Sequence, residues 1–201
     1  GTDADQHSFV CGPDVWRKVF DTNVFGTLQL TQAVIPSMQR ETELLFRAIL
    51  QDDRPVVEFL NPDFTFVDER LARHYGIPDV RGARMRRVTL APDSPRRGLL
   101  GHGSVLTLTS AANRTSPVVR GKWILENLLG APPPQPPPGV ETNLEKDPKQ
   151  AKATSLRQRL ELHRSSPTCA ACHRLIDPVG LALENFDHTG KWRETDGGVA
   201  I

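Results

Sequence analysis

Two cysteines and a histidine in the last quarter of the sequence have the spacing that attaches a c-type haem. Cys169 and Cys172 are three positions apart, and His173 follows the second cysteine directly. Two thiols at this spacing can form thioether bonds with the two vinyl groups of one porphyrin, and the adjoining imidazole can then bind the iron. The Cys-x-x-Cys-His pattern therefore predicts one covalent haem c with His173 as its proximal iron ligand.

The sixth iron ligand does not follow from this motif. The sequence has only two methionines, Met38 and Met85, and both lie far upstream of the cysteines. The remaining candidates are His163, His188, the distant Met85 or an open position. A second histidine would suit low-potential electron transfer, whereas an open position would suit peroxide or small-ligand chemistry.

Other interpretations of the same residues stay open. Cys169 and Cys172 with His163 and His188 would supply a Cys₂His₂ zinc site, although one histidine precedes the cysteines and the other lies well beyond them. A dithiol redox pair would need a thioredoxin-like βαβ setting, which the sequence does not show. The bland alternative is two ordinary cysteines and a surface histidine. Cys11 is remote from the pair, and we expect it to be unpaired.

Composition narrows the class of protein. The 201 residues allow one or two domains, and 25 Lys and Arg against 24 Asp and Glu give a net charge of +1, which argues against a dedicated nucleic-acid-binding protein. A hydrophobic fraction of 38% with 17 prolines predicts a modest core interrupted by extended segments. No apolar run is long enough to span a membrane. The first residues are not a secretory signal and include no initiator methionine, so we expect a fragment or a processed chain.

The spacing of apolar residues predicts a mostly α-helical protein with few short strands and irregular loops. Helices are expected over residues 14–38 (ended by Pro36), 41–51, 67–75 (ended by Gly76), 116–129 and 155–165. Pro167 should break the last of these before the cysteines, and Asp177 with Pro178 should end the turn that carries His173. Short extended pieces are expected at 64–66 and 84–90, and a strand or buried loop at 98–109. The arginines between residues 84 and 97 are expected to form a solvated edge.

These elements suggest four regions. Residues 1–40 form an N-terminal segment, and residues 41–131 form a helical module of unknown function. Residues 132–153 form a linker that begins with a stiff run of prolines. Residues 154–201 form a small haem-attachment module that we expect to be truncated at its carboxyl end.

Four stretches resemble a known family. They are FTFVDERLARHYGIP (64–78), RGLLG (97–101), TSPVVRGKWILENLLG (115–130), and the segment from His163 through the cysteine motif to DPVGLALENFD (177–187). From about residue 41 onward the chain resembles the planctomycete-type secreted cytochrome-like proteins, whose domains are mostly of unknown function. The resemblance implies that Cys169, Cys172 and His173 attach haem, and it favours His163 over His188 as sixth ligand. It also implies a periplasmic or secreted location, other redox domains or proteins as partners, and further domains at both ends.

The segment 14–38 resembles a different family. It is similar to a central helix of short-chain dehydrogenases, in which Asn23 matches a structural and catalytic asparagine. The glycine-rich dinucleotide loop and the tyrosine–lysine pair of those enzymes are absent, and some 25 residues cannot build the sheet that a nicotinamide requires. We therefore expect no dehydrogenase activity, and a foreign or fused segment that joins the rest near residues 38–41.

The function that these patterns favour is electron transfer through one covalently bound haem. A haem enzyme with an open iron site is the first alternative, and a structural zinc module is the second. The patterns indicate an electron-transfer fragment more than a complete enzyme.

Overall fold

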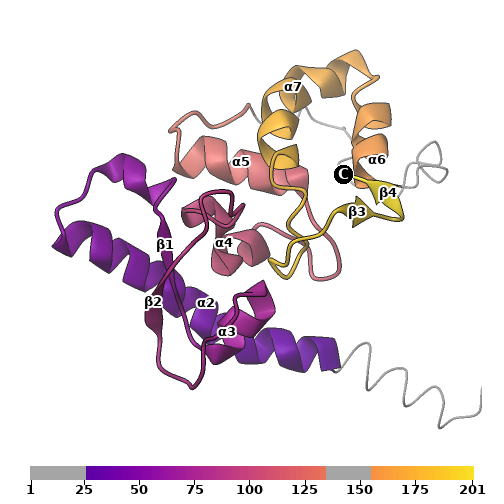
Figure 1. Cartoon of the computed structure of the whole chain (residues 1–201). Helices are drawn as coiled ribbons and strands as arrows, with labels where there is room; N and C mark the ends of the chain where they lie inside the picture. Colours follow the sequence, from indigo (N-terminus) through magenta and orange to yellow (C-terminus); the bar gives the residue numbers. More distant parts are fainter. Residues whose placement is uncertain (1–25, 135–154) are drawn as a thin grey trace, which may run out of the picture.

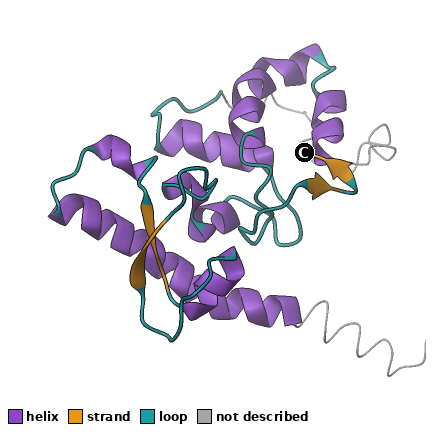
Figure 2. Ribbon diagram, viewed as in Figure 1, coloured by secondary structure: helices purple, strands orange, loops and turns teal. Residues whose placement is uncertain are grey.

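The computed structural model describes residues 26–134 and 155–201, and within them the chain is mostly α-helical, as predicted (Figures 1 and 2). The helices are α2 (Gly26–Gln51), α3 (Glu69–Tyr75), α4 (Gly103–Leu108), α5 (Pro117–Asn127), α6 (Leu156–His163) and α7 (Pro167–Leu181), with short 3₁₀ turns η2 (Val56–Phe59) and η3 (Leu99–Gly101). Two antiparallel pairs of strands join β1 (Phe64–Val67) to β2 (Arg86–Thr89) and β3 (Thr195–Asp196) to β4 (Val199–Ala200). Cys11, Asn23 and most of the proline-rich linker lie outside the described residues.

Helix α2 continues through Pro36, so the described part of the helix expected over residues 14–38, which begins at Gly26, is continuous with the helix expected over 41–51. Proline removes one backbone hydrogen bond and normally bends or ends a helix. Here tertiary packing stabilises the helix across Pro36, because residues at spacings of three and four are buried on both sides of the proline. These residues are Val34, Met38, Glu41, Leu45 and Ile49. Tertiary packing therefore overrides the local stop signal.

The hairpin of β1 and β2 lies against α2 and leads into α3. Phe64 packs with Leu45 and Ile49 of α2, and Val67 packs in a second cluster with Met38. Asp68 caps α3, because its carboxylate accepts a hydrogen bond from the Leu71 amide at 2.8 Å. Gly76 ends α3 with a left-handed φ of 74°, which confirms the predicted stop at this glycine.

The segment 98–109, expected as a strand or buried loop, is instead η3 followed by α4. Gly98 has φ +70°, and a Cβ there would lie 2.2 Å from the Leu60 carbonyl oxygen, so this glycine permits a close crossing of two backbones. Arg96, expected at a solvated edge, is buried: its guanidinium donates to the carbonyls of Gly101 and Gly190 and lies 3.7 Å from the centre of the Tyr75 ring. The basic run is therefore partly structural.

Helices α5 and α7 pack backbone to backbone. Ser116 caps α5, as its sequence predicts, by accepting from the Val119 amide at 3.4 Å. A Cβ on Gly121 would lie 2.1 Å from the Ile176 carbonyl oxygen, and one on Gly180 would lie 1.8 Å from that of Pro117. The two modules expected at 41–131 and 154–201 therefore lie in direct contact (Figure 1).

A buried arginine joins the same two parts of the chain. The Arg120 guanidinium donates to the carbonyls of Leu183, Phe186 and Asp187 in the segment that follows α7. Burial lowers the pKa of Arg120 to about 10, which still leaves it charged at neutral pH. No helix in residues 26–134 or 155–201 has the length and apolarity needed to cross a membrane.

Candidate functional site

The Cys-x-x-Cys-His motif lies inside helix α7, not in a turn after a broken helix. The expected break before the cysteines is confirmed, because α6 ends at His163, and Pro167 is the first residue of the new helix α7, a position at which the missing N–H costs nothing. Pro178, expected to end the turn, lies within α7 close to its last residue. Gly180 on the last turn packs against Pro117, and this contact holds the helix together beyond the proline.

The helical geometry brings the three motif residues to one side of α7. Positions i, i+3 and i+4 of a helix are surface neighbours, and Cys169, Cys172 and His173 have this spacing. Both cysteines are free thiols and half-buried. The Cys172 sulfur lies 4.0 Å from the Pro134 carbonyl oxygen, at the start of the predicted linker. Two thiols and one imidazole therefore lie along one stripe of one helix, which is the donor set that a covalent haem uses.

His173 is oriented by a buried carboxylate one turn further along. Its Nδ1 lies 2.8 Å from Oδ1 of Asp177, whose side chain is 0% exposed. A carboxylate accepts hydrogen bonds, so Nδ1 carries the proton and donates. In the neutral ring the lone pair then lies on Nε2, the nitrogen that a metal would bind. The His173 side chain keeps 15% of its surface exposed.

A basic side chain from α6 approaches the other oxygen of the same carboxylate. The Nε of Arg164 lies 3.5 Å from Oδ2 of Asp177, and the arginine is 28% exposed. This distance is an ion pair rather than a hydrogen bond. Asp177 therefore faces one hydrogen-bonded imidazole and one nearby guanidinium.

The candidates for a sixth ligand lie in three different places. His163, the last residue of α6, has its ring centre 4.8 Å from that of His173, with the rings at 72°. His188 instead lines a cavity of about 450 Å³ together with Arg159 and Arg193. The two methionines pack in the core cluster of α2 and α3, where Met38 is fully buried. Of these side chains, His163 is the one whose ring contacts that of His173.

The ligands of the alternative zinc site do not come together among the described residues. In the part of the chain that the structure describes, no three His, Cys, Asp or Glu side chains form a group that would hold a metal ion. A single imidazole with two sulfurs for thioether bonds fits a haem, because the porphyrin itself supplies four of the iron ligands. The described donor set thus fits haem c better than tetrahedral zinc.

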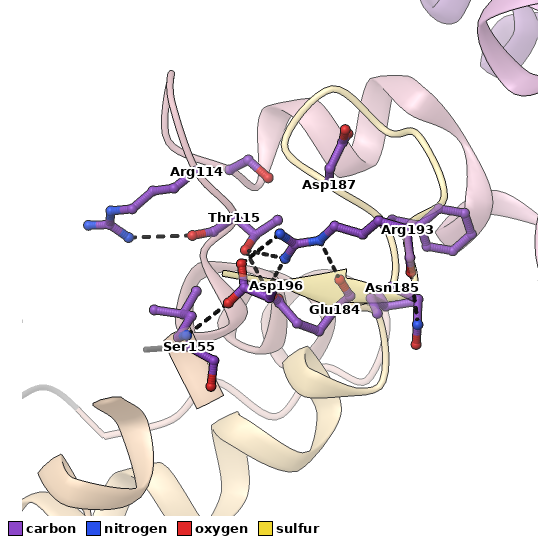
Figure 3. A network of polar contacts seen from close by, with 12 residues as sticks. Arg114, Thr115, Ser155, Glu184, Asn185, Asp187, Arg193 and Asp196 are labelled. Atoms are coloured by element: carbon purple, nitrogen blue, oxygen red, sulfur yellow. Dashed lines mark hydrogen bonds and ion pairs between the residues drawn. The ribbon is translucent and has the colours of Figure 1, made fainter. Parts of the chain in front are cut away.

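A polar network that sequence analysis did not find holds the chain after α7 (Figure 3). Arg193 forms ion pairs with Glu184 and, at 2.8 Å, with Asp196. Glu184 also accepts from the Thr115 hydroxyl at 2.6 Å, and Asp196 accepts from the Leu156 amide at 2.9 Å. Burial raises the pKa of Glu184 above its ordinary value. The network ties the starts of α5 and α6 to the segment after α7.

A second buried histidine lies in the other half of the molecule. His102 is fully buried, its Nδ1 lies 2.9 Å from the Thr42 hydroxyl, and its Nε2 lies 3.8 Å from the fully buried carboxylate of Glu41. Glu41 also accepts from the hydroxyls of Thr65 at 2.5 Å and Tyr75 at 2.6 Å. Burial lowers the pKa of His102 and raises that of Tyr75 well above its usual value. The sequence placed His102 in no cluster, since its partners are 27 to 61 residues away in α2, β1 and α3.

Comparisons with known proteins find two families. One family model, PSD4, a protein of unknown function (DUF1592), matches residues 14–77. This match crosses residues 38–41, where we expected a join, and it includes all of segment 14–38. Nothing in the comparisons supports the resemblance of that segment to a dehydrogenase. No curated protein and no solved structure matches the chain.

The second family model covers the candidate site. PSCyt3, a protein of unknown function (DUF1588), matches residues 96–196, which include α5, α6, α7 and the whole cysteine motif. By their names both families are cytochrome-like domains of the planctomycete type, which agrees with the family resemblance expected from residue 41 onward. The match covers just over half of the residues, and the chain therefore belongs to the PSCyt3 (DUF1588) family.

Proposed function

We propose that the chain carries one haem, bound covalently through Cys169 and Cys172, and that it transfers electrons through this group. One observation carries the proposal. Helix α7 presents both thiols and His173 on one side, and the hydrogen bond from His173 Nδ1 to Asp177 leaves Nε2 as the iron-binding nitrogen. When bound, the haem would supply a one-electron Fe(III)/Fe(II) couple.

The surface around the motif suits a large flat apolar group. Leu175, three positions after Cys172, is 60% exposed, and Leu162, next to His163, is also exposed. Exposed leucines are common on protein surfaces, but Leu175 lies one turn from Cys172 on the helix that holds the two thiols and the imidazole. A porphyrin packed here would cover apolar side chains that water now contacts, which would stabilise the loaded protein.

The proposal includes where the protein matures. Free thiols must be presented reduced to the haem and then held as thioethers, and covalent haem attachment belongs to compartments outside the reducing cytosol. We therefore place the protein in the periplasm or outside the cell, with another redox domain or protein as its partner.

The test is covalent haem in a host that can mature c-type cytochromes. We expect the purified chain to stain for haem on a denaturing gel, and the peptide that contains residues 169–173 to gain the mass of one haem. The double variant Cys169→Ala/Cys172→Ala should lose both signals. Cys11→Ala, a matched control for the loss of a thiol, should keep them. A wild-type chain without added porphyrin mass rules out the proposal.

We propose His163 as the sixth ligand, because its ring lies 4.8 Å from that of His173 at the contact of α6 and α7; the two rings would have to separate to hold an iron between them. His163→Ala should then change the absorption spectrum of the loaded protein from low-spin to high-spin, while His188→Ala should leave it unchanged. The reverse result would assign His188. If neither variant changes the spectrum and cyanide binds without displacing a ligand, the iron site is open, and the haem-enzyme alternative takes its place.

A further inference from the structure

We infer that Asp177 is a positioning residue that fixes the His173 ring and lowers the reduction potential of the iron bound to it. The inference rests on the proposed function and deepens it. Asp177 would not touch the haem. It would act through His173, by the hydrogen bond to the nitrogen that faces away from the iron.

The helix itself enforces this contact. His173 and Asp177 are four residues apart on α7, so their side chains are neighbours on the helix surface. Because Asp177 is 0% exposed, water does not compete for the oxygen that accepts from Nδ1. A carboxylate shielded from water interacts more strongly with its partner than an exposed one. The ring is therefore held in one tautomer and one orientation.

The carboxylate of Asp177 interacts more strongly with the His173 imidazole than with any other described group. Its second oxygen, Oδ2, has no hydrogen-bond partner among the described residues, and Arg164 approaches it only to 3.5 Å. Arg164 is also partly exposed, so solvent weakens its attraction to Asp177. The balance favours the hydrogen bond to His173, with Arg164 as a weaker opposing influence.

The consequence for the iron has a definite sign. A carboxylate on the far nitrogen increases the electron density that the imidazole donates to a bound metal. More donated density stabilises Fe(III) relative to Fe(II) and so lowers the potential. Removing the negative charge of Asp177 should raise the potential, and removing the positive charge of Arg164 should lower it.

The experiment is redox titration of the loaded protein with two matched pairs of variants. Asp177→Asn keeps the shape of the side chain, and we expect it to favour Fe(II) roughly tenfold relative to wild type, a rise of about 59 mV for one electron. Glu161→Gln removes the same charge from an exposed position on α6 and should shift the potential much less. Removing the positive charge of Arg164, the C-cap residue of α6, by Arg164→Gln should shift the potential downward. Arg157→Gln, which removes an exposed arginine within α6, should have the smaller effect. Equal shifts in the Asp177 and Glu161 variants, or a downward shift in Asp177→Asn, overturn the inference.

A second measurement needs no haem. In the haem-free protein at a pH where His173 is neutral, ¹⁵N NMR should show the proton on Nδ1, and an Nε2-protonated ring overturns the inference even if haem attaches. If Asp177→Asn does not fold, Arg164→Gln and the NMR result still decide it. Failure of the wild type to take up haem counts against the proposed function, whereas haem uptake with unchanged potentials counts against this inference alone.

Discussion

His102 and His173 are each accompanied by a buried carboxylate, yet their surroundings differ. His102 is closed in by α2 and α4, and the nearby Glu41 is bonded to Thr65 and Tyr75. His173 lies on α7 with part of its surface exposed and only its Nδ1 engaged by Asp177. The first arrangement leaves no nitrogen that a ligand can reach and stabilises the fold. The second leaves one nitrogen available, so the open side, not the carboxylate, distinguishes the histidine that we propose as functional.

The largest expected effect comes from removing each carboxylate in the haem-free protein. Glu41→Leu would leave the hydroxyls of Thr65 and Tyr75 buried without an acceptor, and we expect a loss of about 3–5 kcal/mol in the free energy of unfolding. Asp177→Leu should cost less than about 1.5 kcal/mol, because His173 and Arg164 can turn to water. Urea unfolding measures both. Equal losses would remove the distinction between a closed and an open site.

The glycines of the two regions should also respond differently. A Cβ at Gly180 would meet the Pro117 carbonyl oxygen at 1.8 Å, and backbone cannot move without shifting a helix. We expect Gly180→Ala to cost about 3 kcal/mol, at the upper end of overpacking effects. At Gly103 the Cβ would meet the Tyr75 hydroxyl and the flexible end of Met38 at 2.7 and 2.8 Å, so Gly103→Ala should cost about 1–2 kcal/mol. A smaller loss for Gly180→Ala, measured by thermal or urea unfolding, would show that α5 and α7 are not locked together.

Acid should weaken the closed region through His102. Burial and the nearby Arg96 lower its pKa in the folded protein, while Glu41 opposes them more weakly than burial acts. Below the ordinary pKa of about 6.5 the unfolded chain binds a proton that the folded protein resists, so the free energy of unfolding falls as the pH drops, by up to about 1.4 kcal/mol per pH unit. His102→Gln cannot titrate and should show a shallower decline between pH 6.5 and 5. Identical slopes for wild type and variant would mean that His102 does not resist protonation.

The smallest expected effect concerns the ion pair at the open site. Arg164 is partly exposed and lies 3.5 Å from Asp177, so Arg164→Gln should change the stability of the haem-free protein by less than about 1 kcal/mol. A larger loss in urea unfolding would mean that Arg164, rather than His173, is the main partner of Asp177, and that the two regions are more alike than their exposures indicate.

The sequence predicted residues of the candidate site only where they are close in the chain. Cys169, Cys172 and His173 form a motif that is recognised by its spacing, and the end of α3 at Gly76 and the start of α5 at Ser116 follow from local chemistry. The partner of His173 was missed because Pro178 was expected to end the turn at Asp177. Had the helix been continued, the i, i+4 spacing would have paired the two residues.

What the sequence could not predict depends on contacts between distant segments. Arginine is usually a surface residue, and only the fold places Arg96 against Gly190, nearly a hundred residues away. The same holds for Glu41 and His102, and for α2, whose buried face outweighs the stop signal of Pro36. Burial of a charged side chain is a property of the assembled structure, because its partners come from several elements.

The glycine contacts between α5 and α7 also limit how α7 can move when a group binds beside it. Carbonyl oxygens occupy the positions where side chains would otherwise separate the two helices, so α7 cannot move closer to α5. A bulky group that binds beside Cys169 and Cys172 would have to be accommodated without moving α7 toward α5. The contact with α5 therefore fixes the position of the helix that carries both thiols.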